Sequence, residues 1–228
     1  MIITLDGPIA TGKSTIARKL AEELGYIYFD TGAMYRGITW LAIEKKIDID
    51  DPSQMDALLK EFLFEIKIKR GERHYWVNKQ DVTLPIRGDQ VTSQVSRVAA
   101  NPAVRDKLVS MQRDFSNGVN AVFEGRDLGS VVFPKADLKI FLTARIEVRA
   151  ERRFIELKAK FPEESSNLTI EKAIEDINKR DNYDSTRVTS PLIKADDAII
   201  VDTSDKTIDE IVLEILEIKD AMGSQRKH

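Results

Sequence analysis

The sequence predicts an α/β fold in which a five-stranded parallel sheet lies between helices on both of its faces. Two observations predict it. Five short apolar runs have the length of buried strands, and amphipathic helical patterns lie between and after them. Several of these runs are apolar at consecutive positions, as in parallel strands that are covered on both sides. A chain of 228 residues is long enough for one such domain with embellishments.

The elements follow one another in a regular order along most of the chain. The expected strands lie at residues 2–5, 26–29, 121–124, 139–143 and 198–202. The expected helices lie at residues 13–24, 33–46, 53–62, 89–98, 101–116, 146–160, 169–183 and 207–221. The polar tail at 223–228 is expected to fray.

One long insertion, residues 31–117, interrupts the alternation between the second and third strands. It is too long for an ordinary loop, and such excursions tend to carry function. Within it, apolar and polar residues alternate over 64–68, a turn follows at Gly71, and "HYWV" has the pattern of a returning strand. We therefore expect a small antiparallel ribbon inside the insertion.

The composition excludes several classes of site. The chain has no cysteine and two histidines, His74 and His228, which excludes disulfides, thiol catalysis and Cys/His zinc sites. Its net charge of −3 argues against a protein that coats nucleic acid or an anionic membrane. The start of the chain lacks the pattern of a signal peptide, and no apolar run approaches the ~20 residues that span a bilayer. We expect a cytoplasmic protein in which any basic site is local.

The clearest motif is "GPIATGKST", which fits the phosphate-loop pattern G-x-x-x-x-G-K-[ST] between a strand and an amphipathic helix. Glycines let backbone N–H groups turn toward phosphate oxygens, Lys13 supplies a positive charge, and the Ser14 hydroxyl is a ligand for Mg²⁺. A glycine-rich turn that binds nothing would need neither side chain, so we expect an ATP site. Its residues would be Gly7, Pro8, Ile9, Ala10, Thr11, Gly12, Lys13, Ser14 and Thr15.

Arginines follow two of the predicted strands at the point where each strand ends. Tyr35 and Arg36 come after the second strand, and Arg126 and Asp127 come after the third. Ligands of open α/β sheets bind beyond the carboxyl ends of the strands. A single arginine there is readily a surface ion pair, whereas two at one crevice indicate a site for a second, anionic molecule.

A further cluster lies on the helix expected at 169–183 and just beyond it. Arg180, Asp184 and Arg187 have the spacing i, i+4, i+7, which places them on one helix face. Two interpretations stay open: an intrahelical ion pair, or arginines that neutralise a transferring phosphate beside an aspartate that accepts a sugar hydroxyl.

Three more arginines share a face of the helix expected at 146–160, namely Arg149, Arg152 and Arg153. The polar stretch 160–167 follows them, a combination that suits a lid closing over ATP; a plain solvated helix is the alternative. Phosphoryl transfer depends on positioning and charge neutralisation, so many arginines without a catalytic histidine or cysteine fit that chemistry.

Six stretches together carry a resemblance to a known family: "GPIATGKST", "FDTGAMYR", "VSRVAANPAVR", "EGRDLGSVVFPKADLKIFLTA", "RAERR" and "RDNYDSTR". In order and spacing they resemble bacterial cytidylate (CMP) kinases, of the P-loop nucleoside monophosphate kinase superfamily, over nearly the whole chain. The resemblance implies ATP-dependent phosphorylation of CMP and dCMP with Mg²⁺, in a three-layer P-loop NTPase fold. Its parts would be a core (1–30, 118–145, 185–228), an NMP-binding insertion (31–117) and a short helical lid (146–184).

The resemblance also implies roles for individual residues. Catalytic roles fall on Lys13, Arg126, Arg187, Arg149, Arg152 and Arg153. The CMP-binding residues would be Thr31, Arg36, Ser96, Arg105, Arg126, Asp127, Arg180, Asp184 and Arg187. In that family Ser96, Arg105 and Asp127 match residues that read the base. Ala10 stands where many family members have glycine, and Thr31 stands where some have serine. Alanine would tighten the loop if position 10 needs an unusual φ, and threonine keeps the hydroxyl.

Other functions compete with this one. A kinase for AMP, UMP or shikimate would share most of these features. A nucleotide sensor that has lost catalysis is disfavoured because Lys13 and the acceptor arginines are intact. A P-loop switch that binds a partner protein is disfavoured because Arg126 and Asp127 stand where a switch motif would follow the third strand. We expect a monomer whose partners are ATP and CMP or dCMP, with no nucleic acid and no membrane.

Overall fold

The computed structural model describes residues 1–163 and 165–225 of the chain. It divides into two compact units, a core unit of Met1–Phe29 with Gly118–His228 and an inserted unit of Asp30–Asn117. His228 and the end of the tail that was expected to fray lie outside the described residues. No helix in the described part of the chain has the length and apolar character needed to cross a membrane.

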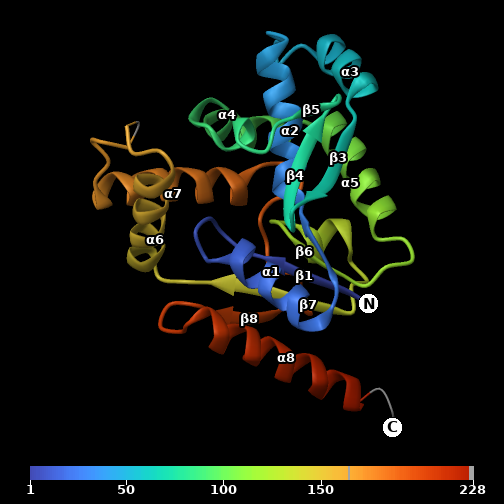
Figure 1. The fold of residues 1–228 in the computed structure, drawn as a ribbon, viewed down its shortest axis with the longest axis vertical. Helices are drawn as coiled ribbons and strands as arrows, with labels where there is room; N and C mark the ends of the chain where they lie inside the picture. The colour runs from blue at the N-terminus through green and yellow to red at the C-terminus, as the bar shows by residue number, and fades with distance from the viewer. Residues whose placement is uncertain (164, 226–228) are drawn as a thin grey trace. The chain divides into compact units, whose positions relative to one another are not determined.

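The core unit contains a five-stranded sheet in the order β2-β6-β1-β7-β8 (Figure 1). Its strands are β1 (Ile2–Asp6), β2 (Ile27–Asp30), β6 (Ala121–Glu124), β7 (Leu138–Thr143) and β8 (Ile199–Asp202). β1 is central and pairs in parallel with both β6 and β7, and β7 pairs in parallel with β8. The predicted five-stranded parallel sheet is confirmed, because each consecutive apolar run forms a strand at its expected place.

Two helices of the core unit pack on this sheet around one apolar cluster. They are α1 (Lys13–Leu24) and α8 (Ile208–Gln225), which runs along β8 (Figure 1). Ile16 and Leu20 of α1 and Ile211 of α8 are buried with Leu5 and Ile140 of the sheet. α1 ends at a glycine in the left-handed conformation (φ 64°), which lets its backbone N–H bond the last turn of the helix.

The remaining elements of the core unit follow the carboxyl ends of β6 and β7. A short π-helical turn, η2 (Leu128–Val132), comes after β6, and α6 (Ile146–Lys160) comes after β7. α7 (Ile170–Thr186) packs against α6, and Thr169 caps it by accepting the Lys172 N–H at 3.2 Å. α6 carries Arg149, Arg152 and Arg153, and α7 carries Arg180.

The inserted unit holds five helical elements and a small sheet. Its helical elements are α2 (Thr31–Glu44), α3 (Pro52–Glu61), η1 (Pro85–Arg87), α4 (Asp89–Ala100) and α5 (Pro102–Phe115). Its antiparallel sheet has the order β3-β4-β5, from β3 (Phe64–Lys69), β4 (Glu72–Val77) and β5 (Gln80–Asp81). Buried side chains of α2, α3, α4 and α5 form one cluster with Phe64 and Tyr75 of this sheet.

The ribbon has one strand more than the sequence predicts, because a second tight turn follows the first. Arg70 and Gly71 both have positive φ in the β3–β4 turn, and Asn78 and Lys79 (φ 46° and 70°) repeat the arrangement in the β4–β5 turn. Two consecutive positive φ values are typical of a two-residue hairpin turn. Without a glycine, the Asn78–Lys79 turn carries a weak signal in the sequence.

Candidate active site

Two glycines of the phosphate loop in the core unit have positive φ values, which residues with a side chain rarely adopt. Gly7 has φ 147°, and a Cβ at that position would lie 2.3 Å from the carbonyl oxygen of Leu142. Only glycine fits such a close approach. Gly12, at φ 90°, precedes the first turn of α1. The loop therefore lies directly on the end of β7.

Ala10 occupies a left-handed conformation, with φ 62°. For a residue with a Cβ this conformation costs about 1 kcal/mol, so the alanine that departs from the family pattern carries local strain. Position 10 therefore has a backbone conformation that glycine, but not alanine, adopts without strain.

Lys13 lies inside the loop that precedes it. Its ammonium donates to the Pro8 carbonyl oxygen at 2.5 Å and to the Thr11 Oγ1 at 3.3 Å, and the side chain is buried. Burial, with the nearby Arg126 charge, lowers the pKa of Lys13 well below its ordinary value. Burial therefore disfavours the charged form of Lys13, and an anion beside the ammonium would favour it again.

Ser14 and Glu124 face each other across the loop and the end of β6. The Ser14 hydroxyl donates to Glu124 Oε2 at 2.8 Å, and the Tyr28 hydroxyl donates to Glu124 Oε1. Glu124 is buried and is the last residue of its strand. Sequence reasoning missed Glu124, although its place two residues before Arg126 at a strand end was a usable signal.

Arg149 of the predicted lid ties the loop to α7. It donates to the Ile9 carbonyl oxygen at 3.3 Å and forms an ion pair with Asp181, which in turn accepts the Ile9 N–H at 3.3 Å. The Arg149–Asp181 pair therefore holds both backbone groups of Ile9. Asp181 is a second residue that sequence reasoning missed.

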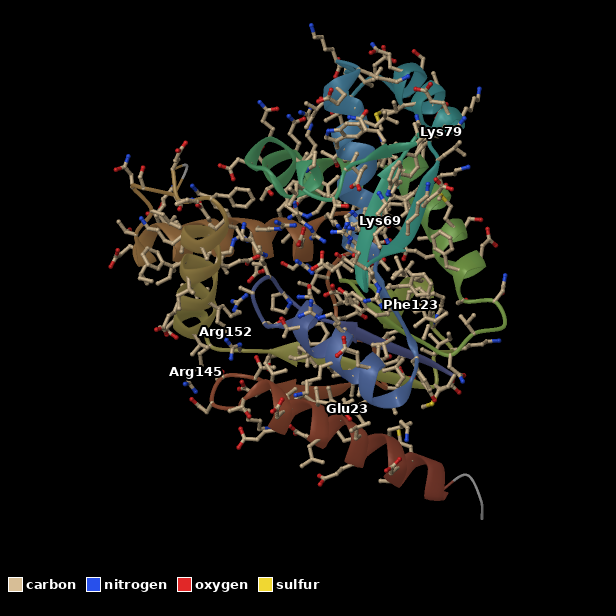
Figure 2. The ribbon with its side chains drawn as sticks, in the orientation of Figure 1. Glu23, Lys69, Lys79, Phe123, Arg145 and Arg152 are labelled. Atoms are coloured by element: carbon tan, nitrogen blue, oxygen red, sulfur yellow. The ribbon has the colours of Figure 1, made fainter. Side chains whose placement is uncertain are left out.

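Arg152 braces the same loop through a different residue. It donates to the Thr203 carbonyl oxygen at 2.6 Å and to Thr203 Oγ1 at 3.0 Å, and the Thr203 hydroxyl donates to the Thr11 carbonyl oxygen at 3.0 Å. Figure 2 shows Arg152 and Arg145 together near the start of α6 and the turn that follows β8. Arg153 instead pairs with Glu156 at 3.0 Å. The three arginines that were predicted to form a lid thus contact three different acidic or backbone partners.

The predicted acceptor-side arginines of the core unit do come together. Arg126 Nε lies 3.3 Å from Asp184 Oδ2, and Arg180 Nε lies 3.9 Å from the same oxygen. Arg187 Nη2 lies 3.8 Å from Asp127 Oδ1. Asp127 and Asp184 are both buried. Burial and the Arg126 charge lower the pKa of Arg180 to about 10.

Asp6 is a further buried carboxylate that sequence reasoning missed. It is the last residue of β1, next to Gly7, and it accepts the backbone N–H groups of Leu128 and Gly129 at 2.9 and 2.8 Å. Burial raises the pKa of Asp6 to about 6, and the nearby Asp127 adds to the rise.

In the inserted unit, Arg36 and Thr31 lie at the start of α2. Asp30 caps this helix by accepting the Ala33 N–H at 3.0 Å, and Arg87 donates to the other Asp30 oxygen at 2.5 Å. Arg36 donates to the Ile86 carbonyl oxygen at 3.0 Å and to Thr92 Oγ1 at 2.9 Å. α2, η1 and α4 are joined by these contacts.

The two remaining predicted residues of the inserted unit lie on α4 and α5. Ser96 is half-buried on α4, one turn beyond Thr92. Arg105 is buried on α5, with its guanidinium 5.1 Å from the centre of the Tyr35 ring. Arg105 is therefore held against an aromatic face, which fixes the direction of its planar fork.

Comparison with known proteins agrees with these features. A family model described as cytidylate kinase matches residues 3–221. A cytidylate kinase of Protochlamydia amoebophila is 58% identical over 226 residues, which cover 99% of each chain. A cytidylate kinase of Bacillus licheniformis is 44% identical over 221 residues, 96% of each chain.

A solved structure supports the fold alone. An uncharacterised protein from Eubacterium ventriosum has a TM-score of 0.50 at 13% identity, with 97% of this chain and 98% of that chain covered. The family model, which spans nearly the whole sequence, and the full-length relatives decide the classification. The chain belongs to the cytidylate kinase family.

Proposed function

We propose that this protein transfers the γ-phosphoryl group of ATP to CMP and dCMP, which gives ADP and CDP or dCDP. The membership of the cytidylate kinase family and the full-length relatives of that name support the proposal. The observation that carries it is the cluster in the core unit where Arg126, Arg180 and Arg187 lie beside Asp127 and Asp184.

Positive side chains crowd this cluster. Arg126 and Arg180 both lie beside Asp184, and Arg187 lies beside Asp127. Burial lowers the pKa of Arg180, and the nearby Arg126 charge lowers it further. The phosphate of a nucleoside monophosphate would relieve the repulsion and accept charge-assisted hydrogen bonds from the guanidinium forks. A phosphate loop with such an anion site in the same unit is the arrangement of a kinase rather than of a switch.

The donor would bind on residues 7–15. Backbone N–H groups of the loop and the Lys13 ammonium would hold its phosphates, and Arg149, bound to the Ile9 carbonyl oxygen, would add positive charge beside the loop. Arg152 and Arg153 complete the proposed lid. Their part would be to neutralise charge and to exclude water during transfer.

Mg²⁺ fits the oxygen groups beside the loop. Ser14 and Glu124 place a hydroxyl and a carboxylate 2.8 Å apart, and hard oxygen groups are what Mg²⁺ prefers. Mg²⁺ in kinases is bound by few protein groups and is held largely by substrate phosphates. When bound, Mg²⁺ would neutralise charge on the β- and γ-phosphates. We propose that Ser14 holds it, with Glu124 orienting the Ser14 hydroxyl.

The resemblance to the family also assigns residues to the base, the sugar and the acceptor phosphate. We propose that Ser96, Arg105 and Asp127 read the cytosine edge, whose carbonyl, ring nitrogen and amine they can match as donors and acceptors. Thr31 and Arg36 would join Arg126 and Arg187 at the CMP phosphate, and Arg180 and Asp184 would lie at the ribose. The buried position of Arg105 against Tyr35 supports a role that needs a fixed guanidinium.

An assay of ADP release with a panel of acceptors tests the proposal. We expect rapid turnover with CMP and dCMP, and much slower turnover with UMP, AMP and shikimate. Equal or faster turnover with AMP would overturn the assignment of the base. ATP hydrolysis that proceeds without an acceptor and is unaffected by CMP would instead favour a switch.

One variant tests whether Asp127 contributes to binding CMP rather than ATP. Asp127→Ala should raise the CMP KM by a factor of ten or more, about 1.4 kcal/mol, and leave the ATP KM nearly unchanged. A fall in ATP affinity with an unchanged CMP KM would show that the role given to Asp127 is wrong.

We also propose that the protein is a cytoplasmic monomer that binds neither nucleic acid nor membranes. The net charge of −3 and the absence of a membrane-crossing helix among the described residues support this. Light scattering after size exclusion, together with cell fractionation, tests these points.

A further inference from the structure

Asp6 joins two loops that are far apart in the sequence. Its Oδ1 accepts the Leu128 N–H at 2.9 Å and its Oδ2 accepts the Gly129 N–H at 2.8 Å, so both carboxylate oxygens are used. The side chain is 5% exposed. On one side Asp6 is followed by the phosphate loop, and on the other its partners directly follow Arg126 and Asp127.

We propose that Asp6 is a positioning residue that fixes the turn carrying Arg126 and Asp127 against the start of the phosphate loop. The inference rests on the proposed function, because it takes Arg126 and Asp127 as contacts of the acceptor. A buried carboxylate that receives two backbone N–H groups sets both the distance and the direction of the segment it holds. A displacement of about 1 Å at a reacting group is enough to slow transfer substantially.

A close approach between the turn and the sheet gives independent support. A Cβ at Gly129 would lie 3.1 Å from Lys139 Cδ and 3.3 Å from Thr4 Oγ1. Thr4 belongs to β1 and Lys139 to β7, so the turn is pressed against both strands. The hydrogen bonds to Asp6 and the close packing at Gly129 therefore both constrain the same turn.

The phosphate loop has other attachments that do not depend on Asp6. Thr203 holds the Thr11 carbonyl oxygen, and the Arg149–Asp181 pair holds both backbone groups of Ile9. A change confined to the Asp6 side chain should therefore disturb the acceptor turn more than the donor loop. This difference separates a positioning role from a general loss of stability.

Asp6→Asn is the first test, because the amide keeps the shape of the side chain but offers only one acceptor oxygen. Its NH₂ group would face one of the two N–H donors, so that one hydrogen bond is lost and the turn is pushed away. We expect kcat/KM for CMP to fall by about tenfold or more, with the ATP KM at saturating CMP within about twofold of the wild-type value.

Asp137→Asn is the matched control. Asp137 Oδ2 accepts the Ile2 N–H at 2.8 Å, so it is also a carboxylate that holds a backbone group of β1, but at the other end of that strand. This variant should leave both KM values and kcat within about twofold of wild type. Both variants are measured at a temperature at which circular dichroism shows them to be folded.

Gly129→Ala tests the same turn without touching the carboxylate. The new methyl group must displace its neighbours or the turn by a few tenths of an ångström, so we expect a smaller fall in kcat/KM for CMP, about threefold. If Asp6→Asn fails to fold, Gly129→Ala carries the test alone. The proposal is overturned if the folded variants keep wild-type kcat/KM for CMP, or if the ATP KM rises as much as the CMP KM.

These outcomes are distinct from failure of the proposed function. If the wild-type protein does not phosphorylate CMP, the function itself is wrong. If it does and the variants at Asp6 and Gly129 behave like Asp137→Asn, only the positioning role is wrong.

Discussion

The Ser14 hydroxyl donates a hydrogen bond to Glu124 Oε2 at 2.8 Å, although the two residues are 110 positions apart in the sequence. The bond links the first turn of α1 to the end of β6 and fixes the direction of the hydroxyl. An oriented hydroxyl beside a carboxylate is the part of the phosphate site most suited to holding Mg²⁺.

Glu124→Gln should therefore impair catalysis more than folding. The amide keeps a hydrogen-bond acceptor for Ser14 but removes the negative charge, so we expect kcat to fall about 100-fold and the Mg²⁺ concentration needed for half-maximal rate to rise. Tyr28→Phe removes the other hydrogen bond to Glu124 and keeps the charge, and it should lower kcat less than about threefold. Magnesium titrations of both variants at saturating substrates are the measurement, and an unchanged Mg²⁺ requirement in Glu124→Gln would contradict the assignment.

Ala10→Gly should stabilise the protein. Glycine adopts φ 62° without strain, which relieves about 1 kcal/mol, and the greater freedom of the unfolded chain offsets only part of the gain. Ala57→Gly on the exposed side of α3 removes the same methyl group from an ordinary helix and should cost about 1 kcal/mol. Urea unfolding decides the point, and a loss of stability in Ala10→Gly equal to that in Ala57→Gly would rule out strain at Ala10.

The unfolding free energy of the wild-type protein should depend on pH through Asp6, and this dependence should be absent in Asp6→Asn. The pKa of Asp6 is about 6 in the folded protein, whereas the ordinary value for an aspartate is 3.8. The folded state therefore binds a proton on Asp6 more tightly than the unfolded state does. The resulting stability is fully present below about pH 4 and is lost as the pH rises through about 6. Two pKa units correspond to about 3 kcal/mol.

Unfolding free energies at pH 4.5, 5.5 and 7 check this prediction. Relative to Asp6→Asn, the wild-type protein should lose stability steadily over that series. Asp137→Asn should keep the wild-type pH dependence, and a flat difference between wild type and Asp6→Asn would mean that Asp6 titrates normally.

Arg126→Lys should weaken acceptor binding even though it conserves the charge. A lysine cannot present the planar fork with which an arginine binds both a carboxylate and a phosphate, so we expect the CMP KM to rise about tenfold. Arg145→Lys is the control: Arg145 pairs with Asp205 at the exposed start of α6 (Figure 2). Exposed pairs contribute little, so its steady-state constants should match wild type. Equal CMP KM values in the two variants would show that Arg126 does not contact the acceptor.

Most of the core unit could be predicted from the sequence because its signals are local. A buried parallel strand needs only a short apolar run, and the phosphate loop needs a fixed spacing of glycine, lysine and serine. β5 was missed because its turn, Asn78–Lys79, reaches positive φ without glycine. The π-helical turn at Leu128–Val132 has no sequence pattern of its own.

The supporting residues of the site could not be predicted because their partners are distant in the sequence. Asp6 meets Gly129 across 123 positions, and Asp181 meets Ile9 across 172. The helical spacing at Arg149 and Arg152 indicated one shared face, but their partners, Asp181 and Thr203, come from other elements. Spacing within a helix predicts neighbours on that helix and says nothing about what the helix meets.

The hydrogen bond from the Thr203 hydroxyl to the Thr11 carbonyl oxygen spans 192 positions. The motif follows β1, whereas Thr203 directly follows β8. A fragment that stops before β8 therefore keeps "GPIATGKST" but lacks the hydrogen bond that Thr203 gives to the loop. We expect such a fragment to hold its phosphate loop less rigidly, so the presence of the motif alone does not make the loop fit to bind a nucleotide.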